Sequence, residues 1–407
     1  MSNQTNFATD FPAGKATGLI TKIQKLAREN GSEARIVGGA VRDWLMRRPV
    51  KDFDMAINMP ITRFINILNK HNVKFHQTGL AHGTITVVQD GVSIEVTQTR
   101  IDVKSDGRHS EVKETTDWSA DANRRDFTVN AIYVTDNGTM YDPYNGALDI
   151  QHRKLKFIGC ADARIEEDFL RILRAFRFVA CLPAFALAKR DIDAIKRHCH
   201  KINTLSVERI TDEFSKWLAA ENPITALKLA VKIGLDSHGF GFEFSLDNLK
   251  IGNLEQVFLQ LDWLARLASI TPVSDKNKIV SVMQFSRQQQ KRFERLMREF
   301  TEAEAEALAT SKWKQTAYWH ASDIQDMARI YSIRTGFVFA QDLLHEFDAF
   351  EKPNFPISGE DLIQLGWVPG PQLGAKLVEL ERIWVLNEFK IPSDSNFLTE
   401  NIKKTIN

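Results

Sequence analysis

A pair of glycines, followed about a dozen residues later by two alternating aspartates, constrains this chain more than any other feature. The stretch reads IVGGAVRDWLMRRPVKDFDMAI, with glycines at 38 and 39 and aspartates at 52 and 54. The apolar pair before the glycines is typical of the end of a buried strand. Gly38 and Gly39 permit a tight turn and a close approach to the backbone. VRDWLM then predicts a helix, and the first backbone N–H groups of a helix favour phosphate.

The two aspartates predict a cation site. In a strand, residues i and i+2 point to the same face, so Asp52 and Asp54 would present two carboxylates side by side. Paired carboxylate oxygens suit Mg²⁺. A magnesium site beside a phosphate site favours phosphoryl or nucleotidyl transfer. Each feature alone is common in turns and at strand edges, and their combination and order carry the inference.

Composition narrows the class of protein. The 407 residues are 43% hydrophobic and 26% charged, which is typical of a water-soluble chain of two to four domains. No apolar run is long enough for a membrane span, and the N-terminus lacks signal or transit character, so we expect a cytoplasmic protein without a membrane partner. Three cysteines without CxxC spacing indicate neither a zinc site nor a disulfide framework. A net charge of +1 leaves only local basic stretches for nucleic acid, at 170–178, 189–201 and 287–298.

The pattern of apolar residues predicts an α+β fold. A helix is expected at 20–30, then short strands from 35 to 157, interrupted by a helix at 61–72. From residue 163 onward helical periodicity replaces the strands. We therefore expect a head with a mixed sheet and helices, followed by an all-α neck, body and tail. The expected boundaries are 1–34 for an N-terminal extension, 35–160 for the head, 161–220 for the neck, 221–352 for the body and 353–407 for the tail.

A second motif, Arg124-Arg125-Asp126, precedes the apolar run FTVNAIYV, which predicts a strand. Two guanidiniums at a strand start can bind a triphosphate through paired hydrogen bonds. A surface ion pair is the alternative. Asp142, in the turn DPYNG, could brace the arginines or simply form the turn.

The third motif is the stretch IEEDFLRILRAFRF at 165–178, which predicts one amphipathic helix with a buried face. Asp168, Arg171 and Arg174 recur every third residue and would be neighbours. A carboxylate that accepts from an amino group and a guanidinium that donates to its neighbouring acceptor would admit cytosine and adenine. That pair would reject guanine and uracil. Arg177, half a turn away from Asp168, would reach phosphate or pack locally. A helix with internal ion pairs is the alternative.

In this order the motifs resemble those of the class II tRNA nucleotidyltransferases, the CCA-adding enzymes related to bacterial poly(A) polymerases. The resemblance runs from about Ile36 to Glu213 through GGAVRD, DFD, RRDFTVNAIY, DPYNG, EEDFLRILRAFRF and SVERITDEF. Farther on, residues 358–384 are similar to the tails of alphaproteobacterial members.

The resemblance implies a role for each matching residue. It implies that Asp52 and Asp54 bind Mg²⁺ and, with Arg125, are catalytic. The implied nucleotide-binding residues are Gly38, Gly39, Arg42, Arg125, Asp168, Arg171, Arg174 and Arg177. Glu95, in the predicted strand VSIEVTQT, shares a face with other polar residues and is a candidate third carboxylate.

Residues 100–112 match the family's flexible loop, through Arg100 and Asp102 and then Asp106, Gly107 and Arg108. In the family this loop helps to switch specificity from C to A, and enzymes that add only CC lack it. Its presence indicates addition of the terminal A. A charged hairpin loop without that role is the alternative.

The expected function is template-independent addition of C, C and A to the 3′ end of tRNA, with CTP and ATP as substrates and pyrophosphate as product. The helical parts would hold the acceptor arm through phosphates and shape. Three alternatives remain: a poly(A) polymerase, an enzyme that adds only the terminal A, and a non-catalytic RNA-binding protein.

Overall fold

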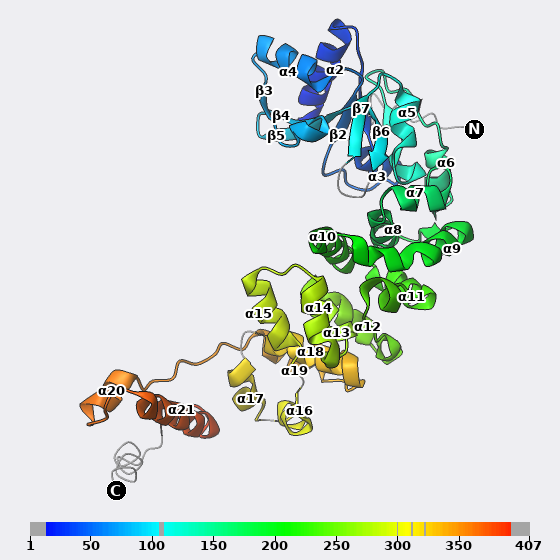
Figure 1. Ribbon diagram of the computed structural model, residues 1–407. Helices are drawn as coiled ribbons and strands as arrows, with labels where there is room; N and C mark the ends of the chain where they lie inside the picture. Colours follow the sequence, from blue (N-terminus) through cyan, green and yellow to red (C-terminus); the bar gives the residue numbers. More distant parts are fainter. Residues whose placement is uncertain (1–13, 106–109, 299, 311, 321–322, 392–407) are drawn as a thin grey trace. The chain divides into compact units, whose positions relative to one another are not determined.

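The computed structural model describes residues 14–105, 110–298, 300–310, 312–320 and 323–391 (Figure 1). The chain divides into two compact units. Unit 1 comprises Met1–Glu243 with Val282–Gln284, and unit 2 comprises Phe244–Ser281 with Phe285–Asn407.

Unit 1 contains every strand of the described chain. The strands are β1 Ala34–Val37, β2 Asp54–Ile57, β3 Lys74–His76, β4 Thr84–Gln89, β5 Val92–Gln98, β6 Arg100–Ser105, β7 Ser110–Glu114, β8 Tyr133–Val134, β9 Met140–Tyr141, β10 Lys154–Leu155 and β11 Ala186–Leu187. Its α-helices are α2 Thr17–Glu29, α3 Gly39–Leu45, α4 Ile61–Lys70, α5 Trp118–Asn123, α6 Gly146–Gln151, α7 Ala161–Glu167, α8 Leu170–Cys181, α9 Lys189–His198, α10 Val207–Leu218 and α11 Pro223–Ile233. Shorter helical turns are η1 Gly14–Ala16, η2 Leu80–His82, η3 Thr128–Asn130, η4 Cys199–Thr204 and η5 Asp236–Phe240.

Unit 2 is helical in the residues described. Its helices are α12 Leu254–Gln260, α13 Trp263–Ile270, α14 Lys276–Val282, which ends in the short return to unit 1, α15 Arg287–Leu296, α16 Glu302–Leu308, α17 Trp313–His320, α18 Ile324–Thr335, α19 Gln341–Asp348, α20 Gly359–Gln364 and α21 Pro371–Leu386. Short turns are η6 Asp247–Lys250 and η7 Val273–Asp275. Local sequence signals explain several helix starts, such as the capping box of Ser286 with Gln289 at α15.

The main sheet has seven strands in the order β3-β4-β5-β2-β1-β8-β9. Strands β2 and β5 are parallel and the other neighbours are antiparallel, so the sheet is mixed. A mixed sheet in the N-terminal part and helices beyond it confirm the predicted α+β class. The finer division into extension, head, neck, body and tail stays a prediction.

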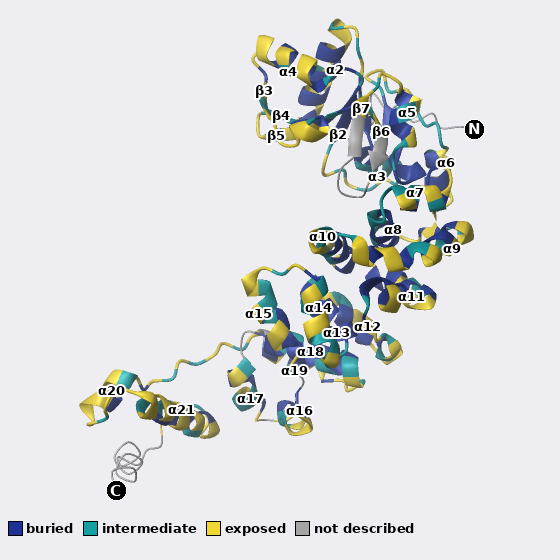
Figure 2. Ribbon diagram, in the orientation of Figure 1, coloured by how far each residue is buried: buried dark blue, intermediate teal, exposed yellow. Residues whose placement is uncertain are grey.

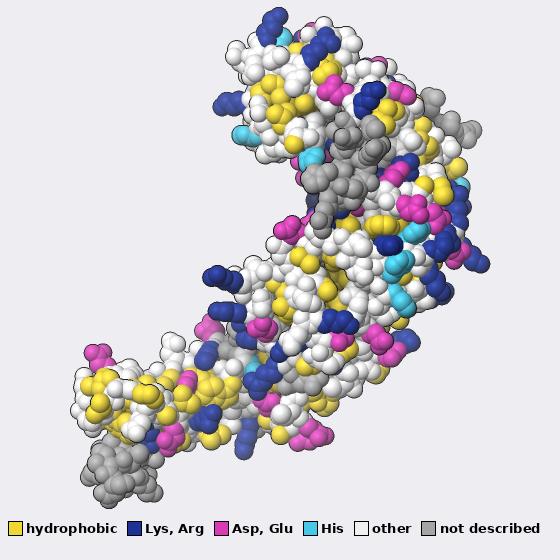
Figure 3. All heavy atoms as spheres, in the orientation of Figure 1, with side chains coloured by type: hydrophobic (Ala, Val, Ile, Leu, Met, Phe, Trp, Pro, Cys, Tyr) yellow, Lys and Arg dark blue, Asp and Glu magenta, His cyan; other side chains and the backbone are white. Residues whose placement is uncertain are grey.

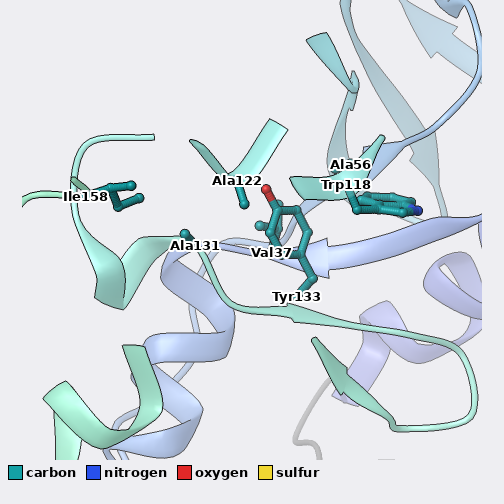
Figure 4. Packing of buried hydrophobic residues seen from close by; sticks show 7 residues of the cluster. All are labelled: Val37, Ala56, Trp118, Ala122, Ala131, Tyr133 and Ile158. Atoms are coloured by element: carbon teal, nitrogen blue, oxygen red, sulfur yellow. The ribbon is translucent and has the colours of Figure 1, made fainter. Parts of the chain in front are cut away.

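Helices and loops bury most of the sheet, but Ser93 and Glu95 leave one face of β5 open to solvent. The apolar stripe of α2 packs on β1 and β5, and the buried side of α4 includes Phe64 and Leu68. The middle strands are dark blue in Figure 2, whereas the outer side of α4 is yellow and exposed. A second cluster contains Val37, Ala56, Trp118, Ala122, Ala131, Tyr133 and Ile158 (Figure 4). In that cluster the hydroxyl of Tyr133 lies next to Ala122 of α5.

Helix α8 forms the centre of the helical part of unit 1. It packs against α10 and α11, and Ile172, Leu173 and Phe176 are fully buried. The ring of Phe176 lies 5.0 Å from that of Trp217 on α10. The burial of these residues confirms the predicted apolar face, although Phe169 is only half-buried.

Three local predictions were wrong. The expected single helix at 165–178 is two helices, because Asp168 has extended backbone (φ −160°, ψ 107°) between α7 and α8. The expected strand at 127–134 is a short helical turn, η3, followed by the two-residue strand β8. Strands also do not end before residue 163, since β11 pairs in parallel with β10.

Candidate active site

One cross-strand row of the sheet carries the predicted carboxylates. Asp54 begins β2 and is paired with Glu95 on β5 and with Val37, the last residue of β1, on its other side. Directly opposed residues in a sheet have side chains on the same face. Asp54 and Glu95 therefore lie side by side, and Gly38 follows Val37 at the end of the row. The register brings the glycine turn and the aspartate motif together and adds a third carboxylate.

The charges of these carboxylates act on one another. The pKa of Asp54 is raised above its ordinary value, first by loss of solvation and next by the negative charge of Glu95. Arg125 lowers that pKa, and Asp52 raises it further. Asp52 and Asp54 both remain exposed to solvent. An accumulation of negative charge at a solvent-accessible edge attracts a cation.

The glycine turn lies between two guanidiniums. Gly38 has φ 76° and ψ −128°, a backbone conformation that residues other than glycine rarely adopt. A Cβ at Gly38 would lie 3.8 Å from Nη1 of Arg125, and one at Gly39 would lie 3.6 Å from Nη2 of Arg42. The absence of side chains at both positions leaves the backbone open beside two positive groups, which is the arrangement expected of a phosphate site.

Arg125 is held by two neighbours. Its Nε donates to the hydroxyl of Tyr133 at 2.9 Å, and its Nη2 lies 3.3 Å from the carboxylate of Asp121. The Tyr133 hydroxyl in turn donates to the same Asp121 oxygen at 2.7 Å. The negative charge of Asp121 and the contact with Tyr133 outweigh burial, so the pKa of Arg125 is raised and the group stays positive.

A chain of polar contacts joins the glycine turn to α8 and α10. Arg42 donates to Asn130 at 2.8 Å, and Asn130 donates to Asp126 at 3.1 Å. Asp126 accepts from Arg174 at 2.7 Å. Arg174 and Arg177 both contact Glu213 of α10, at 3.5 and 2.6 Å. Asp126, from the second motif, therefore holds Arg174, from the third motif, in position.

Three of these arginines also share one aromatic ring. The guanidinium carbons of Arg42, Arg174 and Arg177 lie 5.3, 5.7 and 4.4 Å from the ring centre of Phe178. A cation near an aromatic ring is attracted to it and keeps a defined position. The ring of Phe178 thus helps to position three of the guanidiniums of the site.

Asp168 and Arg171, the residues predicted to read the base, make separate contacts within the protein. Because the backbone is extended at Asp168, its carboxylate accepts instead from Arg209 of α10, at 2.7 Å, and from the backbone of Leu170. Arg171 is buried and donates to the backbone oxygens of Arg164 and Arg124 at 2.8 and 3.0 Å. It also pairs with Glu167. Arg171 therefore fastens the break between α7 and α8, whereas Asp168 stays partly exposed.

The expected loop begins as a β-hairpin. Strands β6 and β7 pair antiparallel, with a register shift between Asp102 and Lys104. Thr99 and Thr115 close the hairpin, and the backbone N–H of Arg100 donates to Asp121 at 3.3 Å. Asp106, Gly107 and Arg108 lie outside the described residues. Asp142 accepts from the backbone of Gly146 and Ala147 and so forms the turn rather than bracing an arginine.

Sequence reasoning missed several residues that organise this site. They are Asp121, Tyr133, Asn130, Phe178, Arg209 and Glu213. For Asp121 a signal existed, since Arg124 and Arg125 follow it by three and four residues on a helical stretch, the spacing of ion pairs. The contacts of Arg209 and Glu213 with α7–α8 join segments more than thirty residues apart, and no local pattern reveals them.

Two family models match the chain. The "Poly A polymerase head domain" covers residues 34–156, and the "Probable RNA and SrmB- binding site of polymerase A" covers residues 184–240. A Danio rerio protein named "CCA tRNA nucleotidyltransferase 1, mitochondrial" is 30% identical over 95% of this chain and 90% of its own length. The chain belongs to the family of CCA-adding tRNA nucleotidyltransferases.

Other family members agree in extent and fold. A Streptococcus pyogenes CCA-adding enzyme is 30% identical over 90% of this chain and 91% of its own length. The crystal structure of the Bacillus stearothermophilus CCA-adding enzyme in complex with CTP superposes with a TM-score of 0.74, at 25% identity, over 94% of this chain and 97% of that one. In this tRNA nucleotidyltransferase, no helix within the described residues is long and apolar enough to cross a membrane.

Proposed function

We propose that this tRNA nucleotidyltransferase adds C, C and A to the 3′ end of tRNA without a nucleic-acid template, from CTP and ATP. The observation that carries the proposal is the register Glu95–Asp54–Val37, which sets carboxylates beside the Gly38-Gly39 turn and Arg125. Family membership supplies the substrate class. The 3′ hydroxyl of the tRNA attacks the α-phosphate of the nucleotide, the bond to the β-phosphate oxygen breaks, and pyrophosphate leaves.

We assign Mg²⁺ as the metal of this site. The donors are all carboxylate oxygens, which Mg²⁺ prefers. Among the described residues no group of three or more His, Cys, Asp or Glu is arranged to hold a metal alone. That finding fits an ion that keeps waters and binds phosphate oxygens besides one or two carboxylates. Bound there by Asp52 and Asp54, the metal would supply Lewis-acid chemistry at the α-phosphate.

The protein groups have separate roles in this proposal. The backbone at Gly38-Gly39 and the side chain of Arg125 bind the triphosphate, and Arg42 supports them from α3. Arg174 and Arg177, held by Asp126 and Glu213, supply positive charge from α8. Asp168 reads the amino group shared by cytosine and adenine at the edge of the base. Arg125 is half-buried, which makes its contacts stronger than they would be in water.

Single-nucleotide assays test this function. Purified protein is incubated with labelled CTP, ATP, UTP or GTP, one at a time, and tRNA that ends at the discriminator base, at C or at CC. We expect C on the first two substrates, A on the third, and little U or G on any. Incorporation of A alone, on tRNA ending in CC alone, would identify an A-adding enzyme. Long tracts of A would identify a poly(A) polymerase.

The compartment is a separate proposal. All three cysteines are free thiols, with Cys160 exposed and Cys199 buried. Free thiols suit a reducing compartment, and we assign the cytoplasm. Fractionation of cells with an antibody against the protein tests the assignment.

A further inference from the structure

Asp121 contacts both arginines of the second motif, Arg124 and Arg125, although the sequence motifs assign it no role in binding substrate. It lies on α5, and its side chain is fully buried. One oxygen, Oδ2, accepts from Tyr133 at 2.7 Å and faces Nη2 of Arg125 at 3.3 Å. The other oxygen, Oδ1, accepts from Nε of Arg124 at 2.8 Å and from the backbone N–H of Arg100 at 3.3 Å. Oδ1 also lies 2.7 Å from Nη2 of Arg124, so the two oxygens together face five donor groups.

Only an ionised carboxylate satisfies these five contacts. A carboxylate offers acceptors on both oxygens, whereas an asparagine of the same shape replaces one oxygen by an amino group. That group would point its hydrogens at donors, whichever way the amide turned. A buried guanidinium that loses its counter-charge is also strongly disfavoured. The environment thus selects for negative charge at residue 121 and not merely for a polar side chain.

The two oxygens serve different parts of the molecule. Oδ2 acts on Arg125, whose Nη1 lies beside Gly38 at the phosphate end of the site. Oδ1 acts on Arg100, the first residue of the β6–β7 hairpin. The root of that hairpin is also fastened by the Thr99–Thr115 pair, by the bond from Thr99 to Ile57 of β2 and by the bond from the Arg100 side chain to the backbone oxygen of His82. One rigid carboxylate therefore connects the hairpin root with the arginine of the phosphate site.

We propose that Asp121 is a positioning residue that couples the root of the β6–β7 hairpin to Arg125. The inference rests on the proposed function, in which Arg125 binds the triphosphate. A displacement of the hairpin root changes the contact at Oδ1, and the shared carboxylate transmits the change to Arg125. Nucleotide affinity then depends on the state of the hairpin, without any direct contact between the hairpin and the triphosphate.

Two substitutions separate the contact of Asp121 with Arg125, through Oδ2, from its contact with the hairpin root, through Oδ1. Asp121→Asn disturbs both, whereas Tyr133→Phe removes only the hydroxyl that joins Arg125 to Oδ2. We expect Asp121→Asn to raise the KM for CTP and ATP about tenfold or more, by analogy with the loss of an outer-shell partner. It should reduce A addition to tRNA ending in CC more than C addition. Tyr133→Phe should raise both KM values and leave the ratio of the two steps unchanged.

Arg100→Pro tests the contact with the hairpin root by itself, because proline lacks the N–H that donates to Oδ1 of Asp121. Arg100→Ala is its control, since it removes the side chain and keeps the N–H. We expect the proline variant to have a lower ratio of A addition to C addition than the alanine variant. Equal ratios in the two variants would overturn the coupling to the hairpin.

Arg125→Ala tests the proposed function separately. If CTP affinity measured by calorimetry is unchanged in Arg125→Ala, the phosphate site itself is wrong. If affinity falls there but Asp121→Asn and Tyr133→Phe match wild type, the site stands and the positioning role is overturned. When Asp121 acts through Arg125, adding Asp121→Asn to Arg125→Ala costs no further CTP affinity.

Asp149→Asn is the matched control for burial. Asp149 is 2% exposed, accepts from Thr128 at 2.8 Å, and pairs with Lys156. We expect it to lower the melting temperature as Asp121→Asn does, with nucleotide KM values unchanged. A rise in KM equal to that of Asp121→Asn would show that general destabilisation explains the effect, and would overturn the proposal.

Discussion

At the scale of single residues, the carboxylates of the site fall into two groups with opposite pKa shifts. Asp54 has a raised pKa, because desolvation and the charges of Glu95 and Asp52 disfavour its ionised form. Burial alone would also raise the pKa of Asp121 and Asp126, but arginine charges and hydrogen bonds outweigh it and lower both values. Asp54 belongs to the carboxylates proposed to bind Mg²⁺, whereas Asp121 and Asp126 have their counter-charges within the fold.

Asp54→Asn should therefore separate activity from stability. The ionised form of Asp54 costs stability above its raised pKa, and this cost disappears as the pH falls and the group is protonated. Asparagine removes the cost, so we expect a melting temperature in EDTA at neutral pH equal to or above that of wild type. Incorporation of both C and A should fall by a factor on the order of a thousand, as for loss of a group that stabilises the transition state. Asp52→Asn should likewise lower incorporation of both C and A.

Calorimetry with and without Mg²⁺ checks this prediction. Magnesium should raise the melting temperature of wild type more than that of Asp54→Asn, because only a folded site that binds the ion is stabilised by it. Substantial turnover by the variant, or an equal response to magnesium, would contradict the metal assignment.

Acidification should destabilise unit 1 through Asp121 and Asp126. Their folded pKa values lie below the ordinary value of 3.8. Their contribution to stability is present above that value and is lost as the pH falls through the folded values. We expect urea midpoints to fall steeply below about pH 4 and less steeply in Asp126→Asn. A variant with the same pH dependence as wild type would show that Asp126 contributes nothing to this loss.

At the scale of elements, the break between α7 and α8 changes the roles within the third motif. Asp168 faces Arg209, and Arg171 holds the two helices together. Asp168→Ala should therefore relax base choice, at a cost of about 1–3 kcal/mol of discrimination against U and G. Competition between labelled nucleotides measures that discrimination.

Arg171→Ala should mainly lower stability, by about 1.5–3 kcal/mol for each hydrogen bond of a charged group that is removed. Arg209→Lys is the informative comparison, since lysine keeps the charge and loses the planar hydrogen-bonding geometry. If Arg171→Ala altered base choice without lowering the melting temperature, Arg171 rather than Arg209 would be the partner of Asp168 during catalysis.

The β6–β7 hairpin is the second element with a predicted role of its own. Deleting residues 102–110 removes its distal part and keeps the Thr99–Thr115 pair and the Arg100 contact. We expect CC addition to stay near wild type and the final A to fall strongly, because reshaping of a site by a loop affects the step that needs the new shape. Product length on a sequencing gel is the measurement. Equal slowing of all three steps would indicate a general role in folding or tRNA binding.

At the scale of the whole molecule, the basic stretches are less available for RNA than the sequence indicates. In α15, Arg292 pairs with Asp262 and Asp326, and Arg295 pairs with Asp323. In Figure 3, Lys and Arg side chains are interspersed with Asp and Glu over the visible face. Many of the cations are thus neutralised within the protein, which agrees with the net charge of +1.

Arg287 and Lys291 are exposed cations of α15 and therefore candidates for binding phosphate. Replacing both by Glu should raise the KM for tRNA several-fold and reduce the salt slope of tRNA binding by about one for each phosphate that is no longer bound. Nucleotide KM and melting temperature should stay the same. Fluorescence anisotropy with labelled tRNA over a salt series measures the slope, and an unchanged slope would exclude α15 from the interface.

The sequence by itself determined the class of this protein and most of its local structure. Alternation and turn signals predicted the strands that carry Asp54 and Glu95, and the glycine pair predicted the turn with positive φ at Gly38. These features depend on neighbours along the chain, so spacing records them. The family motifs added the expected reaction, which full-length relatives support.

Only the tertiary structure decided which side chains meet. Strand pairing set Glu95 beside Asp54, and the extended backbone at Asp168 turned its carboxylate toward Arg209. The helix that periodicity predicts as continuous breaks at Asp168, and the buried Arg171 donates to the backbone oxygens of Arg164 and Arg124. Such contacts join residues far apart in the chain, and a buried charge without water depends on the partners that the fold supplies. Spacing along a sequence contains no record of that choice.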